Sequence, residues 1–323
     1  MTVPSAAGKE RSVAPPPDEA IRLWRLAFEG RGILRRLGSD AARLRRLPVS
    51  AAAATGAMET DLLFPGEPDP VVLLARGWSA REIFELALGR GESARPGEPF
   101  PAGGAMAGAC DPARGVFAPG SLPAAALPVA VGALLATRKR TPPVAAIVLV
   151  GPGGTASGDF HEGMNFAAVR GVPLLAIVLG QETTPDPVSP FYREAALDRL
   201  SDRAEAYGIP GDTVSGGDLF AVRDAVAQAL WRARAGAGPA ILEVVLTDEA
   251  GYGCDDALAR CRSRLVGESH ATETHLADIE RTIESTLDEA MHAAGGSPEA
   301  IPHPVLSGVT APSSSQAACP EGS

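Results

Sequence analysis

Lysine is almost absent from this chain of 323 residues, in which Lys9 and Lys139 are the only two. Arginine supplies nearly all of the positive charge, and 39 acidic residues outnumber the 29 basic ones, so the formal net charge is −10. Nucleic acids and acidic membranes are bound through an excess of Lys and Arg, which this chain lacks. The composition therefore argues against a nucleic-acid or membrane partner.

Cysteine and long apolar runs are scarce as well. The four cysteines, Cys110, Cys254, Cys261 and Cys319, include no Cys-x-x-Cys pair, so reduced thiols are expected and a zinc site is not. No window of about 18 residues is apolar and uncharged, and residues 1–20 lack the apolar stretch of a secretory signal. We therefore expect a cytoplasmic protein without a membrane span.

Small and turn-forming residues are concentrated at the two ends of the chain. Residues 1–17 are rich in Pro and Ser, and residues 295–323 are richer still in Gly, Ser and Pro. Such segments bury too little apolar surface to offset the entropy lost on ordering, so both are expected to be disordered tails. Residues 18–294 lie between them without internal repeats and are expected to form one domain.

Three short apolar runs predict the core of the fold: VAAIVLV (144–150), PLLAIVL (173–179) and AILEVVL (240–246). Continuous rather than alternating hydrophobicity predicts burial on both faces, as in a parallel sheet. Amphipathic segments accompany these strands, one from the candidate N-cap Asp218 to Gly236 and another over residues 272–294. The alternation predicts a doubly wound α/β fold with a mostly parallel sheet flanked by helices.

The loop after the first strand, GPGGTASGDFHEG (151–163), lies where open parallel sheets bind ligands. A P-loop is rejected, because the loop has no Gly-Lys-Ser/Thr ending. A dinucleotide site is a weak alternative: Gly151, Gly153 and Ala156 fit G-x-G-x-x-G/A, and Glu182 ends the next strand where a ribose-binding acid would lie. A tight strand–helix turn that binds no ligand is the simpler interpretation.

A longer string around this loop carries a more specific pattern. Residues 151–181, GPGGTASGDFHEGMNFAAVRGVPLLAIVLGQ, resemble the cofactor segment of the α subunits of thiamine-diphosphate-dependent 2-oxo acid dehydrogenases, the E1 component. In that family a Gly-Asp-Gly loop is followed by Ala-Thr-Ser-Glu-Gly-Asp-Phe-His-Glu, by Asn-Phe-Ala-Ala and by a strand ending in Asn-Asn. The resemblance extends over roughly residues 20–294, and it is also carried by residues 62–90, 121–136 and 201–245.

The resemblance implies the thiamine-diphosphate-binding fold, with thiamine diphosphate and Mg²⁺ as cofactors. The family's Mg²⁺ ligands, two side chains and a backbone carbonyl, fall on Pro152, Gln181 and Thr183. Proline has no side-chain oxygen, and the longer side chain of Gln181 displaces its amide oxygen, whereas Mg²⁺ requires near-octahedral ligands at about 2.0–2.1 Å. The positions that match the family's site are Gly151, Pro152, Gly153, Gly154, Gln181 and Thr183.

Other family residues near the diphosphate are replaced too. A Tyr-Arg pair falls on Glu67 and Pro68, and the His after it falls on Pro70. The His of the family's Gly-Pro-His-Thr loop falls on Gly251. We therefore predict a divergent E1 α-like subunit with a degenerate cofactor site, no catalytic residues and a structural or regulatory role. Two alternatives stay open: an active α subunit, which would decarboxylate a 2-oxo acid and pass the acyl group to lipoyl, and a chain that binds another ligand in the reshaped pocket.

An assembly is expected in either case, because the family's cofactor site is shared between an α and a β subunit. The helix after Asp159, with Phe160, Met164 and Phe166, and the run over residues 121–136 are apolar where subunits of the family meet. Large exposed apolar patches are a liability for a monomer. We therefore expect a homodimer, or a heterotetramer with a β-subunit-like chain; the alternative is that both segments are internal.

Overall fold

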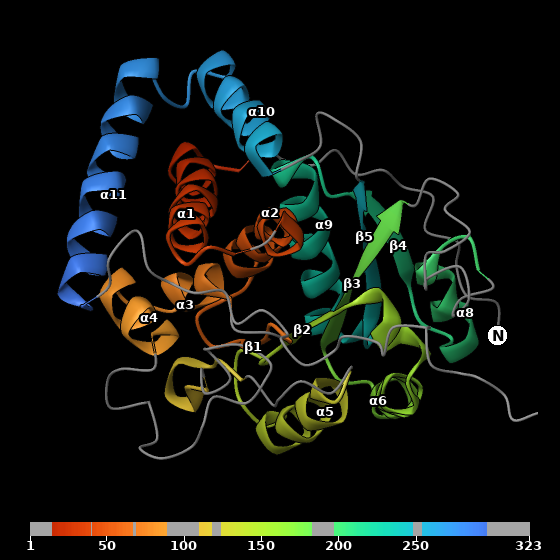
Figure 1. Cartoon of the computed structure of the whole chain (residues 1–323). Coiled ribbons are helices and arrows are strands. Elements are labelled where there is room, and N and C mark those ends of the chain that lie inside the picture. The colour runs from red at the N-terminus through yellow and green to blue at the C-terminus, as the bar shows by residue number, and fades with distance from the viewer. Residues whose placement is uncertain are drawn as a thin grey trace, which may run out of the picture.

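The computed structural model describes residues 15–39, 41–66, 69–88, 110–117, 124–182, 197–247 and 254–295, which form one parallel sheet with helices on both faces (Figure 1). The strands are β1 (Leu62–Phe64), β2 (Ala146–Val150), β3 (Leu174–Glu182), β4 (Gly211–Ser215) and β5 (Ala240–Thr247). Their order is β1-β2-β3-β5-β4, and every strand pair is parallel. The predicted doubly wound α/β fold is confirmed, and the three apolar runs form the central strands.

Successive side chains along the central strands point to opposite faces of the sheet and pack into two separate hydrophobic cores. In β2, Ile147 and Leu149 belong to the core on one face, whereas Val148 and Val150 belong to the core on the other. Because all four are buried, the strand reads as one continuous apolar run in the sequence.

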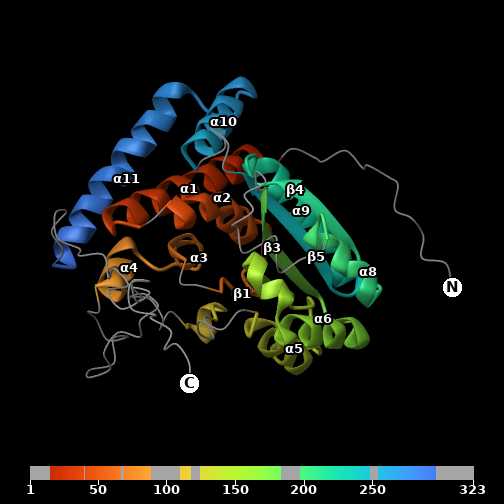
Figure 2. The same ribbon diagram turned by 45° about the vertical axis from the view of Figure 1, so that its right-hand side comes forward.

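More of the described helices cover one face of the sheet than the other (Figures 1 and 2). One face is covered by α1 (Pro17–Arg36), α2 (Ala41–Gly56), α3 (Pro70–Ala75), α4 (Ala80–Ala87), α9 (Leu219–Arg232), α10 (Cys254–Gly267) and α11 (Glu273–Ala293). Within the described residues, the other face carries α5 (Ala126–Thr137), α6 (Gly158–Arg170) and α8 (Arg203–Tyr207). The described residues also form four short helical turns: η1 (Pro112–Arg114), η2 (Pro152–Ala156), η3 (Leu200–Asp202) and η4 (Ala233–Ala237). None of the helices in the described ranges combines the length and hydropathy needed to cross a bilayer.

The ends of the predicted helices agree with the sequence signals. Asp218 caps α9, where its carboxylate accepts from the backbone N–H groups of Phe220 (2.9 Å) and Ala221 (3.1 Å). After α9 the chain continues through η4, in which Gly236 adopts a positive φ of 93° and ends the helical path. Helix α1 begins at Pro17, the last residue of the first expected tail, and residues 1–14 and 296–323 of the two tails lie outside the described residues.

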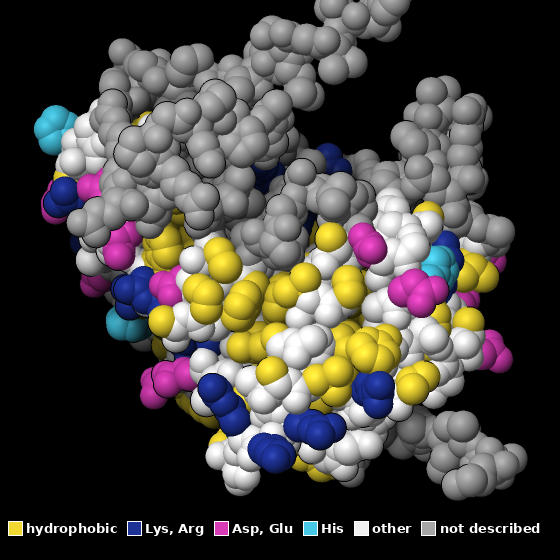
Figure 3. Space-filling model, turned by 90° about the horizontal axis from the view of Figure 1, so that it is seen from below, with side chains coloured by type: hydrophobic (Ala, Val, Ile, Leu, Met, Phe, Trp, Pro, Cys, Tyr) yellow, Lys and Arg dark blue, Asp and Glu magenta, His cyan; other side chains and the backbone are white. Residues whose placement is uncertain are grey.

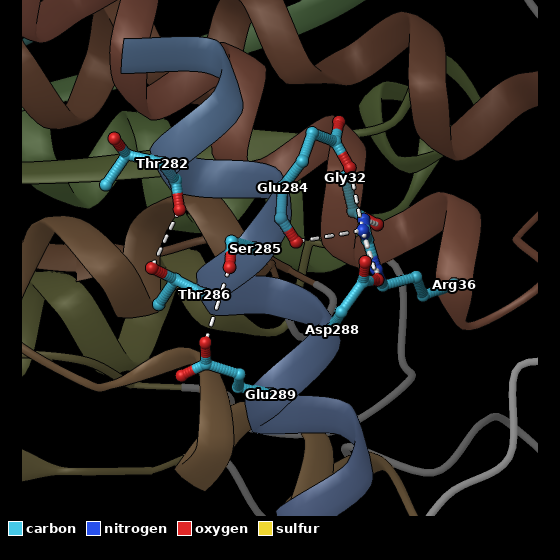
Figure 4. A network of polar contacts seen from close by, with 8 residues as sticks. All are labelled: Gly32, Arg36, Thr282, Glu284, Ser285, Thr286, Asp288 and Glu289. Carbon is cyan, nitrogen blue, oxygen red and sulfur yellow. Dashed lines mark hydrogen bonds and ion pairs between the residues drawn. The ribbon is translucent and has the colours of Figure 1, made fainter. Parts of the chain in front are cut away.

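Helix α11 closes against α1, at the opposite end of the chain (Figure 4). Arg36 donates to Glu284 (2.7 Å) and to Asp288 (2.6 Å), two carboxylates one helical turn apart on α11. Gly32 allows the helices to approach, because any side chain there would overlap Leu287. The contact between α1 and α11 thus combines apolar packing of Gly32 against Leu287 with the ion pairs of Arg36 at its edge.

Two of the residues expected to face a partner are internal. Phe160 and Met164 have exposed fractions of 0%, because they lie one turn apart on the side of α6 that faces the sheet. The prediction that they contact a partner is therefore wrong. Phe166 lies on the outer side of the helix and is exposed.

Candidate functional site

The loop between β2 and α6 is the candidate site. The chain leaves β2 at Val150, turns at Gly151 and passes through η2 before Ser157 caps α6 by accepting from the N–H of Phe160 (3.2 Å). The helix therefore starts at the carboxyl end of the strand, and its N–H groups point toward the place where a parallel sheet binds anions.

Two glycines of this loop differ in what surrounds them. A Cβ added at Gly154 would lie 2.7 Å from Cγ1 of Val150, whereas a Cβ added at Gly151 would meet nothing within 4 Å. Gly151 also has φ −65° and ψ 158°, which any residue adopts. Gly154 is therefore required by packing of the loop on its own strand, and Gly151 has open space beside it.

The polar groups of the loop are bound to the loop itself. The hydroxyl of Thr155 donates to the carbonyl of Pro152 (2.8 Å), and the hydroxyl of Ser157 donates to the carbonyl of Gly154 (2.7 Å). The N–H of Gly154 donates to the carbonyl of Gly151 (3.0 Å). These contacts hold the turn without any ligand.

The structure describes only one of the three inferred Mg²⁺ ligand positions in full. Pro152 opens η2 and offers no side-chain oxygen to a cation. Gln181 lies on β3 beside Leu246 of β5, but its side chain and the whole of Thr183 lie outside the described residues. No group of three or more His, Cys, Asp or Glu side chains within the described ranges could hold a metal ion. Pro152 therefore supplies no side-chain ligand at the position where the family resemblance expects an acidic residue.

The segment after β1 has a structural role at the positions that are described. Glu67 and Pro68 lie outside the described residues, and Pro70 is the first residue of α3, a position that proline favours. Asp69 caps this helix by accepting from the N–H of Val71 (2.9 Å), and Ser50 donates to the same carboxylate. Burial raises the pKa of Asp69 above its ordinary value, with the hydrogen bond from Ser50 opposing that shift. The hydrogen bonds of this acid are therefore those of a helix cap.

The start of α10 contains paired charges beside a hollow of about 210 Å³. Gly251 lies outside the described residues, and the helix begins at Cys254. Asp255 accepts from Arg31 and from Arg35, each at 2.6 Å. Both of these guanidinium groups, which line the hollow, are therefore engaged by the same carboxylate.

Sequence reasoning missed one buried acid near this edge of the sheet. Glu243 of β5 is buried and accepts from the N–H of Ser201 (3.1 Å) and the hydroxyl of Thr213 (3.4 Å). Gly180 on β3 leaves room for it, since a Cβ there would lie 2.6 Å from Oε1 of Glu243. The signal was present as the single charged residue in the run AILEVVL, and its contacts anchor the start of η3.

Comparison with known proteins agrees with this arrangement. Residues 45–247 match the family described as "Dehydrogenase E1 component". The α subunit of 2-oxoisovalerate dehydrogenase from Bacillus subtilis (strain 168) is 32% identical over 307 residues, which span 88% of this chain and 89% of that protein. The α subunit of the acetoin:2,6-dichlorophenolindophenol oxidoreductase of the same organism is 31% identical, over 51% of this chain and 54% of its own length.

A third relative is the pyruvate dehydrogenase E1 component subunit alpha of Staphylococcus aureus (strain Mu50 / ATCC 700699), 31% identical over 57% of this chain and 46% of its own length. The chain thus spans about half the length of two of these relatives and most of the other. Together with the parallel sheet and the retained loop before α6, these matches place the chain in the dehydrogenase E1 component family, as an E1 α-like protein of the 2-oxo acid dehydrogenase type.

Proposed function

We propose that this E1 α-like chain has a degenerate cofactor site and serves as a structural or regulatory subunit. The observation that carries the proposal is the loop at Pro152, where a proline stands at the position of an acidic Mg²⁺ ligand. The hydroxyls of Thr155 and Ser157 donate back into the loop, so this turn is held by contacts of its own.

The packing of the same loop supports this proposal. Gly154 has a steric reason to persist even without a ligand, because its neighbour Val150 leaves no room for a side chain. Packing alone therefore accounts for Gly154, one of the glycines at the family's cofactor-binding positions. A chain that lost its cofactor would keep such a residue and would tolerate change at Pro152.

The alternative is an active α subunit that decarboxylates a 2-oxo acid together with a β subunit. Its support is the similarity to the 2-oxoisovalerate dehydrogenase α subunit, which covers 88% of this chain. In that case the Mg²⁺ would need ligands other than a side chain at position 152, and Gln181 and Thr183 are the positions that the family resemblance offers.

Calorimetric titration with thiamine diphosphate and Mg²⁺, up to about 1 mM cofactor, distinguishes the two proposals. We expect no saturable heat, either from the chain alone or from the chain with any co-purifying partner. Dissociation constants in the micromolar range would overturn the degenerate-site proposal.

Two variants at one position sharpen this experiment. Pro152→Asp restores a carboxylate, and Pro152→Ala is its matched control without an oxygen. We expect both to fold and neither to decarboxylate a 2-oxo acid, because the other replaced positions remain. Activity in Pro152→Asp alone would show that the loss of one ligand is the whole defect.

A subunit role also requires a partner. Here we propose a homodimer or a heterotetramer with a β-subunit-like chain, supported by apolar side chains that remain exposed on α5 and α6. Two of the relatives are named as subunits of dehydrogenases, and one as a subunit of an oxidoreductase.

A further inference from the structure

A hollow of about 210 Å³ collects guanidinium groups away from the candidate cofactor loop. It lies between the carboxyl-terminal part of α1, the amino-terminal part of α2 and the start of α10, three helices that pack together (Figures 1 and 2). We call this space the α1–α10 hollow. Leu44 and Cys254 belong to its lining, and its cations are Arg31 and Arg35 from α1 and Arg45 from α2.

Arg31 is held in place by its surroundings. Its side chain is only 15% exposed, and its guanidinium carbon lies 4.4 Å from the centre of the ring of Phe28. Its Nη1 donates to Asp255, whereas its Nε is buried and has no hydrogen-bond partner among the described residues. A buried donor without a partner is unfavourable, so Arg31 has hydrogen-bonding capacity that Asp255 does not use.

Asp255 marks the place beside the hollow where an anion is stabilised best. Its two carboxylate oxygens accept from two different arginines, Arg31 and Arg35, each at 2.6 Å. Asp255 also lies in the first turn of α10, where the amino end of a 14-residue helix favours negative charge. Guanidinium groups and helix amino ends are the groups with which proteins commonly bind phosphate.

The contacts of Asp255 are exchangeable. Its side chain is 58% exposed and that of Arg35 is 51% exposed, and ion pairs of this kind contribute little to stability because water and salt screen them. Three guanidinium groups line the hollow against two carboxylates, those of Asp255 and Asp256. The lining is therefore positive even with Asp255 in place, although the whole chain has a net charge of −10.

We propose that the α1–α10 hollow binds the phosphate group of a small phosphate monoester, which displaces the carboxylate of Asp255 from Arg31 and Arg35. A phosphate dianion has more charge and more acceptor oxygens than a carboxylate, and the planar fork of arginine matches its geometry. The hollow is smaller than the roughly 300–1,000 Å³ of pockets for drug-sized molecules, so a short carbon skeleton fits better than a nucleotide.

This ligand adds a function to the subunit role proposed above and does not depend on the state of the cofactor loop. Because Asp255 links α10 to α1, binding exchanges a contact between these helices for contacts with the ligand. The charges of the hollow also disfavour a metal ion as its ligand, since three guanidinium groups surround the two carboxylates. Within the described ranges, moreover, no group of three or more His, Cys, Asp or Glu side chains could hold a metal.

Calorimetric titration of the full chain with inorganic phosphate tests the site. The titration is run without Mg²⁺ at about pH 8, where the phosphate is mostly a dianion, and sodium chloride keeps the ionic strength constant. We expect saturable binding with a dissociation constant of about 1 mM or below, and acetate should bind at least about 10-fold more weakly. Absence of saturable heat, or equal affinity for acetate, would overturn the phosphate assignment.

Variants of the ion pair should change the affinity in opposite directions. Asp255→Asn removes the competing carboxylate and is expected to lower the dissociation constant for phosphate about 3–10-fold. Arg31→Gln and Arg35→Gln each remove a donor and are expected to raise it at least about 10-fold. Arg35 is half exposed, so its replacement tests the site even if Arg31→Gln fails to fold. An ion pair with a purely structural role would not make Asp255→Asn bind phosphate more tightly.

Two matched controls separate this site from other cations. Asp288→Asn removes a carboxylate that pairs with Arg36 but does not line the hollow. The double variant Arg138→Gln/Arg140→Gln removes exposed cations that follow α5. Figure 3 shows that Lys and Arg side chains gather along one edge of the molecule in that view. Both controls are expected to leave the affinity for phosphate unchanged, and circular dichroism checks that every variant folds.

Three further results would overturn the proposal. Unchanged affinity in Arg31→Gln and Arg35→Gln would place the phosphate elsewhere, as at the loop before α6. Weaker binding by Asp255→Asn would show that this carboxylate supports the site and does not compete for it. Loss of binding in Arg138→Gln/Arg140→Gln would assign the phosphate to exposed cations. None of these results bears on the degenerate-site proposal, which the separate titration with thiamine diphosphate tests.

Discussion

Replacing Gly154 by alanine should destabilise the protein, and replacing Gly151 should not. A Cβ at Gly154 would lie 2.7 Å from Cγ1 of Val150, a buried residue of β2 with little room to move. Relief requires the loop or the strand to shift, which costs about 1–3 kcal/mol in a well-packed core. At Gly151 the added methyl group meets open space, and restricting the unfolded chain should stabilise the protein by about 0.4–1 kcal/mol.

Urea unfolding followed by circular dichroism measures both effects. With a slope of about 3 kcal/mol per molar urea, Gly154→Ala should lower the midpoint by about 0.3–1 M, and Gly151→Ala should raise it by about 0.1–0.3 M. The two variants lie three residues apart in one loop and introduce the same methyl group, so each controls for the other. Equal midpoints would refute the argument that packing alone preserves Gly154, and the glycine would then need another explanation.

Three further predictions concern buried groups elsewhere in the chain. Arg234→Met should lower the free energy of unfolding by about 3 kcal/mol in urea, because it leaves the fully buried carboxylate of Asp61 without its ion-pair partner. The double variant Asp61→Asn/Arg234→Met should lose less stability than the sum of the two single variants. A loss below about 1 kcal/mol for Arg234→Met would contradict this prediction. Burial raises the pKa of Cys254 and of Cys261 to about 12, whereas Cys110 is exposed. In a Cys319→Ser background, a maleimide at about pH 8 should therefore label Cys110 alone until the protein is unfolded. Fast labelling of Cys254 or Cys261 in the folded protein would show that α10 opens. Burial raises the pKa of Asp69, so its charged form is disfavoured in the folded state. The stability of the unchanged protein relative to Asp69→Asn should therefore rise as the pH falls from above the raised pKa toward the ordinary value near 3.9. A stability difference that is flat or that falls with decreasing pH would contradict this prediction.

The parts of the fold that could be predicted from the sequence are those in which burial is complete. The described side chains of β2 and β3 are buried on both faces and read as apolar runs, and in β5 the run AILEVVL is interrupted only by the buried Glu243. β1 and β4 were not predicted, because β1 has only three residues and β4, GDTVS, is an edge strand with mostly exposed side chains. Edge strands obtain their order from a neighbour, and a pattern within one segment does not contain that information.

The candidate site was predictable in its position but not in its contacts. The order of strand, glycine loop and helix placed Gly151 and Gly154 at the carboxyl edge, and the structure agrees. The sequence could not show that only Gly154 is held by packing, since this depends on the rotamer of Val150. It also could not assign Phe160 and Phe166 to different sides of α6, because apolar residues of this helix occur on both its buried and its exposed side.

The ion pairs of Arg36 on α1 with Glu284 and Asp288 on α11 have a consequence for synthesis of the chain on the ribosome. Arg36 and Glu284 are separated by 248 positions, so at 5–20 residues per second α1 waits roughly 12–50 s for the helix that covers it. During this time α2 and α3 shield other sides of α1, but the side near Gly32 has no partner. Nascent chains that stall before α11 would therefore expose the side of α1 around Gly32. We expect a chaperone to bind a stalled chain first at α1.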